Sequence, residues 1–373
     1  MSGLSHFSFL GRRAATQWAA LAALTLVFGA ALSAARLPAG LLLGAIAAAA
    51  TVAAFEGQTR LPPRLFIMAQ AVIGGMIAQK MTPEILAEMA RDWPVFLAAA
   101  LSVVLVSGAF GWLLTRWRVL PGATAIWGAL PGAASAMIVM AEAYGADMRL
   151  VAFMQYLRVL LVALIASLIA RFAMPGADQA GAAAVAFIAP VDWPRFALTL
   201  ALLLGAAWLA RVTKLPAGPL LLPLFAGAAA QDLGLFTLEL PRAFLALNYA
   251  LLGWAVGLRF TRDILRHAVR ALPAILGATL ALIALCGGLA FVLARLAHLD
   301  PMTAYLAMSP GGIDAVAIVA ASAKLDMSFV MALQTARVLM VILVGPALAR
   351  FLSGQMAASS NPGAARPDEA AID

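Results

Sequence analysis

Two blocks of this chain carry the same pattern of residues at a constant separation of 179 positions. Residues 124–160 read TAIWGALPGAASAMIVMAEAYGADMRLVAFMQYLRVL, and residues 303–339 read TAYLAMSPGGIDAVAIVAASAKLDMSFVMALQTARVL. A fixed period across half of a chain indicates two copies of one structural unit. The shared positions are Thr124/Thr303, Pro131/Pro310, Gly132/Gly311, Asp147/Asp326, Met148/Met327, Gln155/Gln334 and Arg158/Arg337.

Both blocks lie in very apolar surroundings. The chain is 64% apolar and 11% charged, whereas soluble domains are about 45–50% apolar and about 25% charged. Backbone groups in lipid must bond internally, so the apolar segments should be helices. The sequence therefore predicts an all-α integral membrane protein. The net charge of +8 does not indicate nucleic-acid binding, because most Lys and Arg residues flank apolar segments as in membrane proteins.

The apolar segments divide into two sets of six, which predicts about 10–12 transmembrane or re-entrant helices. The run after Arg13 lacks a cleavage site followed by a polar chain, so we interpret it as a retained helix rather than a signal peptide. The predicted parts are an N-terminal cytoplasmic segment (1–13), membrane repeat 1 (14–172), a Pro/Gly-containing linker (173–194), membrane repeat 2 (195–352) and a disordered C-terminal tail (353–373).

The distribution of basic residues predicts that the two repeats have opposite orientations. If the fifth segment of each repeat is re-entrant, the Lys and Arg residues on the two faces, counted up to the start of the sixth segment, number 7 and 3 in repeat 1, but 4 and 6 in repeat 2. A bias that changes sign between homologous halves fits an inverted pair under the positive-inside rule.

The Pro-Gly pairs should interrupt helices at membrane depth. Proline removes a backbone donor and glycine lets the chain turn, so Pro131-Gly132 and Pro310-Gly311-Gly312 predict breaks within apolar segments. Irregular backbone at this depth is tolerated only inside protein or beside a water-filled cavity, where freed N–H groups would favour an anion. The alternative is a simple proline kink between packed helices.

Asp314 follows the second break and has apolar residues on both sides. A carboxylate at this depth is costly and usually functional, so Asp314 is a candidate proton or cation coupling site. Its counterpart is Ser135, so the two halves would supply unlike polar groups. The alternatives for Asp314 are a helix cap or a structural ion pair.

Arg158 and Arg337 are expected near the membrane midplane. Each lies 11 residues after an aspartate, which corresponds to about 16 Å along a helix. Gln155 and Gln334 precede them by one turn on the same face. The expected partners are Asp314, carbonyls freed at the breaks, or an anionic substrate; the alternative is snorkelling from a short span.

Asp147 and Asp326 are interpreted as N-terminal helix caps rather than ligands. The three histidines are scattered and Cys286 is the only cysteine, so the sequence predicts no metal site, no cofactor and no enzymatic activity.

Both copies of the PG…D…Q-x-x-R-V-L pattern, the LPAG segments at 37–40 and 215–218, and Gly57-Gln58 before Leu61-Pro62 resemble the bacterial AbrB-type membrane duplication family. The resemblance runs from about Leu37 to Arg350. It implies a multi-pass protein of the bacterial inner (plasma) membrane, grouped by fold with cation/proton antiporters and anion transporters. Members have been labelled ammonia monooxygenases or regulators of gene expression, and neither label follows from these residues.

Two functions remain open from the sequence. The first is a secondary transporter of a small solute, coupled to protons or a monovalent cation and able to form a homo-oligomer in the lipid bilayer. The second is a membrane sensor that affects gene expression indirectly, without transport and without binding nucleic acid.

The inverted arrangement places Arg118 and Arg266 on the same face of the membrane. Cysteines introduced by Arg118→Cys and Arg266→Cys should therefore both react with an impermeant reagent applied to the same side of oriented vesicles. Labelling from opposite sides would rule out the inverted arrangement.

Overall fold

The computed structural model describes residues 14–35, 37, 39–55, 59–79, 81, 91, 93–121, 123–131, 141, 146–173, 191–214, 218–322 and 325–360. Every regular element in these ranges is a helix. The helices are α1 (Ala14–Ala34), α2 (Gly40–Ala54), α3 (Pro63–Ala78), α5 (Trp93–Arg116), α6 (Thr124–Ala129), α8 (Met148–Ala173), α10 (Trp193–Val212), α11 (Gly218–Asp232), α12 (Arg242–Gly257), α13 (Arg262–Ala268), α14 (Leu272–Leu296), α15 (Pro301–Met308), α16 (Ile313–Ser322) and α17 (Met327–Ser360).

Five of the described helices, α1, α5, α8, α10 and α14, are long and apolar enough to cross a membrane. The pair α12 and α13, bent by 52°, would make a sixth span. Large apolar side chains also cover the outside, such as Leu26 (70% exposed), Phe172 (74%) and Trp208 (66%). Outward apolar side chains on long apolar helices are typical of a lipid-facing surface, so the all-helical, membrane-type prediction is confirmed.

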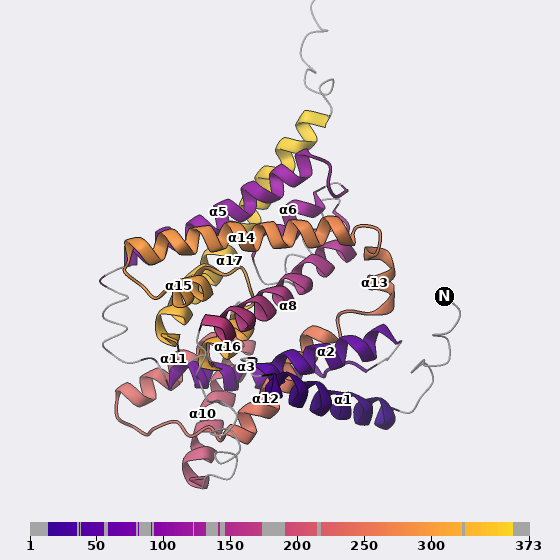
Figure 1. The fold of residues 1–373 in the computed structure, drawn as a ribbon. Helices are drawn as coiled ribbons and strands as arrows, with labels where there is room; N and C mark the ends of the chain where they lie inside the picture. Colours follow the sequence, from indigo (N-terminus) through magenta and orange to yellow (C-terminus); the bar gives the residue numbers. More distant parts are fainter. Residues whose placement is uncertain are drawn as a thin grey trace, which may run out of the picture.

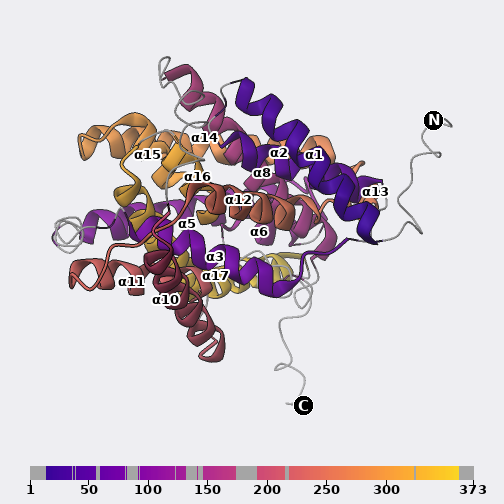
Figure 2. The same cartoon turned by 90° about the horizontal axis from the view of Figure 1, so that it is seen from below.

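The helices form two bundles, and each bundle takes elements from both halves of the chain. The first contains α1, α2, α3, α10, α11 and α12. The second contains α5, α6, α8, α14, α15, α16 and α17, and α8 crosses the centre of the molecule (Figure 1 and Figure 2). The two bundles touch through contacts such as α3 with α16 and α2 with α8.

Close backbone contacts join the helices of the first bundle. A Cβ on Gly74 of α3 would lie 2.4 Å from the carbonyl oxygen of Leu220 in α11. A Cβ on Gly253 of α12 would lie 2.8 Å from the carbonyl oxygen of Leu42 in α2. Glycine lets these helix backbones approach each other closely, as small residues do in membrane helix pairs.

The short helices of the second bundle end where the sequence changes from apolar runs to Pro-Gly. α15 ends at Met308, the chain is non-helical at residues 309–312, and α16 begins at Ile313. In the first half, α6 ends at Ala129, just before Pro131. Both prolines are buried, so these interruptions lie inside the protein rather than at its surface.

The C-terminal boundary differs from the sequence prediction. α17 continues to Ser360, so the first part of the predicted tail, 353–360, is helical. Its sequence, SGQMAASS, contains good helix formers, and Pro362 is the next residue that opposes a helix. The remainder of the predicted tail, 361–373, the N-terminal segment, and linker residues 174–190 lie outside the described residues.

A methyl group at position 74 should disrupt the contact between α3 and α11. Overpacking of this kind costs about 1–3 kcal/mol, so Gly74→Ala should lower the melting temperature of the purified protein in detergent. Gly277→Ala is the matched control, because nothing lies within 4 Å of a Cβ there. Equal melting temperatures for the two variants would contradict the close approach.

Candidate functional site

Two side chains of α8 bind the carbonyl groups at the end of α6. Gln155 donates from Nε2 to the carbonyl oxygens of Trp127 and Leu130, each at 3.0 Å. Arg158 donates from Nη1 to the carbonyl oxygen of Ala129 at 3.0 Å and from Nη2 to Gln155 Oε1 at 2.5 Å. The last carbonyls of a helix have no partner within the helix, and here α8 supplies the missing donors.

The same arrangement occurs at the end of α15. Gln334 of α17 donates from Nε2 to the carbonyl oxygen of Leu306 at 2.7 Å and to that of Ser309 at 3.3 Å. Arg337 donates to the carbonyl oxygens of Ser309 and Gly311, the latter at 2.8 Å. Arg337 therefore binds the irregular backbone between α15 and α16.

The glutamine hydrogen bonds of the two halves join equivalent residues, because donors and acceptors are separated by the same 179 positions as the sequence blocks. Gln155 and Gln334 differ by 179 positions, and so do their acceptors Trp127 and Leu306. The second acceptors, Leu130 and Ser309, have the same separation. The arginines differ in detail, because Arg158 reaches back into α6 whereas Arg337 reaches forward to the break.

Both arginines lie deep in the second bundle, with exposed fractions of 4% for Arg158 and 3% for Arg337. Transfer of a charge into such an interior is expensive unless strong hydrogen-bond partners replace water. Of the three partner types expected from the sequence, the structure places backbone carbonyls at both guanidiniums. Snorkelling does not describe these side chains, since they end in the protein interior.

The break in the second half lies against α8 of the first half. A Cβ on Gly311 would lie 2.7 Å from Val162 Cγ1, and a Cβ on Gly312 would lie 3.6 Å from Val159 Cγ2. Val159 directly follows Arg158, so the break and the first arginine are neighbours. The absence of a side chain at Gly311 permits this contact, whereas a Cβ at Gly312 would make an ordinary van der Waals contact.

Two further side chains join the arginines at this place. Arg158 and Arg337 lie close enough to repel each other electrostatically. Cys286 of α14 is buried at 1% exposure and lies within electrostatic range of both. A Cβ on the next residue, Gly287, would lie 3.9 Å from Cε2 of Tyr305 in α15. We call Arg158, Arg337, Cys286 and Tyr305 the central cluster.

The sequence-predicted site residues divide into two groups. Pro131, Gln155, Arg158, Pro310, Gly311, Gly312, Gln334 and Arg337 are described. Gln155 and Arg158 lie together at the end of α6, and Gln334 and Arg337 lie together at the break between α15 and α16. Gly132 and Ser135 lie outside the described residues, as does the side chain of Asp314, whose backbone is in the first turn of α16.

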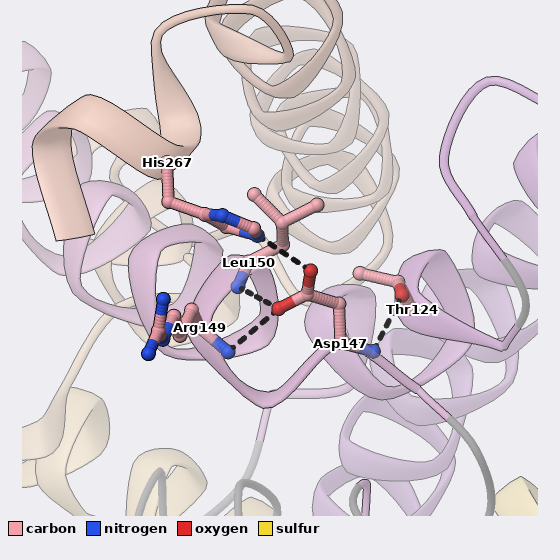
Figure 3. Close-up of polar contacts among 5 residues, drawn as sticks. All are labelled: Thr124, Asp147, Arg149, Leu150 and His267. Atoms are coloured by element: carbon pink, nitrogen blue, oxygen red, sulfur yellow. Dashed lines mark hydrogen bonds and ion pairs between the residues drawn. The ribbon is translucent and has the colours of Figure 1, made fainter. Parts of the chain in front are cut away.

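Asp147 lies at the N-terminus of α8 and connects three elements (Figure 3). Its Oδ1 accepts hydrogen bonds from the backbone N–H groups of Arg149 (2.9 Å) and Leu150 (3.2 Å). Its Oδ2 lies 2.6 Å from Nε2 of His267 in α13. Its backbone N–H donates to Thr124 Oγ1 at 3.0 Å. This is the geometry of an N-cap, with a side-chain contact from the second half added to it.

Asp326 is placed similarly at the start of α17, where Oδ1 accepts from the backbone N–H of Phe329 at 3.1 Å. Partial burial alone would raise the pKa of the Asp147 carboxyl, but the hydrogen bonds from His267, Leu150 and Arg149 outweigh it and lower this pKa below its ordinary value.

The space beside Asp147 is much larger than the space beside Arg158. A groove of about 330 Å³ is lined by Ala146, Asp147, Met148, Arg149 and His267. The space beside Arg158 measures about 10 Å³, which holds about one water molecule. The space beside Arg158 is therefore too small for a solute in this conformation.

Sequence reasoning did not find several of these contacts. His267 and Cys286 had no pattern that linked them to the repeated blocks, and Tyr305 has no tyrosine at its counterpart, Ile126. Of these contact residues, Thr124 was marked by the sequence pattern, because it is shared between the two blocks as Thr124/Thr303. Within the described residues, no group of three or more His, Cys, Asp or Glu side chains could hold a metal ion.

Comparison with known proteins assigns the family. Residues 41–353 match the family model described as "Transition state regulatory protein AbrB". The chain belongs to the AbrB family. The match covers both repeated blocks and the central cluster.

Two relatives illustrate the range of this family. A protein of Escherichia coli strain K12 named "Putative regulator AbrB" is 46% identical over 338 residues, which cover 90% of this chain and 97% of the relative. A protein of Bacillus subtilis strain 168 named "Uncharacterized protein YhjN" is 27% identical over 308 residues, covering 78% of this chain and 79% of the relative. No solved structure matches the chain.

The contact of Asp147 predicts a pH-dependent contribution to the stability of this AbrB-family protein. Its folded-state pKa lies below the ordinary value of 3.8, so the contribution is fully present above pH 3.8 and is lost as the pH falls through the lower, folded-state pKa. Asp147→Asn keeps the capping oxygen but removes the charge, and should lower the melting temperature at pH 7 and pH 5.

Tryptophan fluorescence during thermal unfolding in detergent provides the measurement, with Asp326→Asn as the control cap. The deficit of Asp147→Asn should exceed that of Asp326→Asn and shrink only below pH 3.8. A deficit that disappears between pH 7 and pH 5 would assign the effect to a different titrating group.

Proposed function

We propose that this protein is a secondary transporter of a small solute in the bacterial inner membrane. The observation that carries the proposal is the pair of interrupted helices, α6 and α15–α16, whose freed carbonyls are held by deep arginines at equal positions in the two halves. Discontinuous helices that meet inside a membrane protein are the usual site of solute and ion binding in transporters.

An inverted repeat is the second part of the proposal. α3 of the first half packs against α11 of the second half. α12, the counterpart of α3, packs in the same way against α2, the counterpart of α11. Gly74 corresponds to Gly253 at an offset of 179, and Leu42 corresponds to Leu220 at an offset of 178. The two close approaches are therefore equivalent, which supports a pseudo-two-fold relation between the repeats.

The position of α13 supports the same orientation. Val119 and Leu120, after α5, belong to one apolar cluster with Ile264 and Leu265 of α13. His267 of α13 also contacts Asp147. Arg118, which follows α5, and Arg266 of α13 thus belong to neighbouring segments, which supports the same-side placement that the inverted arrangement requires.

We assign ion coupling to Asp314. It lies in the first turn of α16, and α16 packs against α8 and α17, which carry the two arginines. A carboxyl group on this helix that exchanges a proton or binds a monovalent cation would link solute binding to an ion gradient. The solute, the bilayer and further copies of the chain are the proposed partners, and neither enzymatic chemistry nor nucleic-acid binding is part of the proposal.

A membrane sensor is the second candidate. The printed name of the Escherichia coli relative contains the word regulator, which favours a role in gene expression exerted through a bound or transported solute. A sensor would bind its solute tightly without moving it.

Flux in proteoliposomes distinguishes the two functions. The purified full chain should accumulate at least one solute of a broad panel, and an imposed pH gradient should change the initial rate. Binding of a solute with no uptake, with or without the gradient, would favour the sensor and contradict transport.

Removal of a central arginine should abolish flux without preventing membrane insertion. Arg337→Ala leaves the carbonyl of Gly311 without its donor and that of Ser309 with Gln334 alone, so uptake should fall at least tenfold, a loss of about 1.4 kcal/mol or more. Arg295→Ala is the matched control, because Arg295 is exposed at the end of α14. Unchanged uptake by Arg337→Ala would remove Arg337 from the mechanism.

A further inference from the structure

The central cluster has an excess of positive charge. Within the described residues, neither Arg158 nor Arg337 has a carboxylate at ion-pair distance, and their guanidiniums repel each other. The repeat-related segments that adjoin the two breaks, 131–143 and 310–322, contain two acidic residues, Glu142 and Asp314, whose side chains lie outside the described residues. Among the described residues, the two guanidiniums therefore lie in a low-dielectric interior without a paired carboxylate.

The central cluster also has hydrogen-bonding capacity that the described residues do not use. Nε of Arg158 and Nε of Arg337 are buried, and neither has a hydrogen-bond partner in the described part of the chain. The same holds for the Tyr305 hydroxyl and for Gln334 Oε1. A buried polar group without a hydrogen-bond partner is destabilising, and these groups come from α8, α15 and α17, of which α15 packs against both of the others.

The donors and acceptors match one class of ligand. A guanidinium N–H is suited to a carboxylate oxygen, and charge-assisted hydrogen bonds of this kind are short and strong. Gln334 Oε1 can accept a hydrogen bond, and the Tyr305 hydroxyl can donate or accept one. Both are suited to a hydroxyl group on the same ligand.

We propose that Arg158, Arg337, Tyr305 and Gln334 bind a small carboxylate, preferably a hydroxycarboxylate. The site lies where α8 of the first half approaches α15 and the break of the second half. This inference rests on the proposed transport function and names the substrate class of that site. The space of about 10 Å³ beside Arg158 is too small for such a ligand, so the ligand enters a more open conformation, and the structure is the closed state.

Cys286 reports on this site in the unaltered chain, because it is the only cysteine and lies beside both guanidiniums. Anionic sulfonatoethyl methanethiosulfonate and cationic trimethylammonioethyl methanethiosulfonate are compared on the full chain in liposomes. Each rate is divided by the rate of the same reagent with a free small thiol. The anionic reagent should be favoured about tenfold or more by the local field, and sodium lactate should slow it relative to equal sodium chloride.

Equal corrected rates, or a preference for the cationic reagent, would overturn the anion site. If neither reagent reacts with Cys286, small solutes do not reach the central cluster, and the proposed site would be wrong. Protection by inorganic phosphate without protection by lactate or acetate would overturn the carboxylate assignment. Because no substitution is needed, misfolded variants do not affect the result.

Ligand-induced stabilisation gives a second readout. Lactate should raise the melting temperature of the full chain and of Arg171→Gln, whose side chain is exposed near the end of α8. Arg158→Gln and Arg337→Gln should lose that shift. An equal lactate shift in Arg158→Gln would remove Arg158 from the site.

These results are separable from those for transport. Lactate protection of Cys286 without flux would retain the carboxylate site and contradict the transporter. Flux of a neutral or cationic solute, with no charge preference at Cys286, would retain the transporter and contradict the carboxylate site.

Discussion

The site depends on one interaction, the donation of hydrogen bonds from two buried arginines to carbonyls freed where short helices end. A membrane interior offers no water to such carbonyls, and it offers none to a guanidinium. In this protein the guanidiniums donate hydrogen bonds to the freed carbonyls, and Gln155 and Gln334 donate to carbonyls at the same helix ends. The breaks at α6 and α15 can therefore lie inside the second bundle rather than at the membrane surface.

The packing of the two bundles positions the helices that make these hydrogen bonds. The close approaches at Gly74 and Gly253 hold helices of opposite halves together in the first bundle. Within the second bundle, α8 extends from its cap at Asp147, which contacts His267 of α13, to the break, where it meets Gly311 and Gly312. Contacts between the halves thus determine where Arg158 and Arg337 converge.

Much of this could be predicted from the sequence. Apolar length predicts the helices, Pro131 and Pro310 predict the interruptions, and the spacing from Asp147 to Arg158 predicts a deep arginine. The freed carbonyls were one of three expected partners, and hydrophobic patterning could not choose among them. The contacts of His267 and Cys286 depend on packing between distant helices, which no local pattern encodes. The end of α17 was predicted too early because a polar composition was interpreted as disorder.

The central claim is that the break of the second half lies against α8 beside Arg158, and cross-linking tests it most directly. A Cβ at Gly312 would lie 3.6 Å from Val159 Cγ2, so Val159→Cys and Gly312→Cys should form a disulfide in a Cys286→Ser chain under mild oxidation in membranes. The pair Val159→Cys and Gly205→Cys should not, because nothing lies within 4 Å of a Cβ at Gly205. A gel shift for the first pair alone is the predicted result, and no shift for that pair would contradict the account.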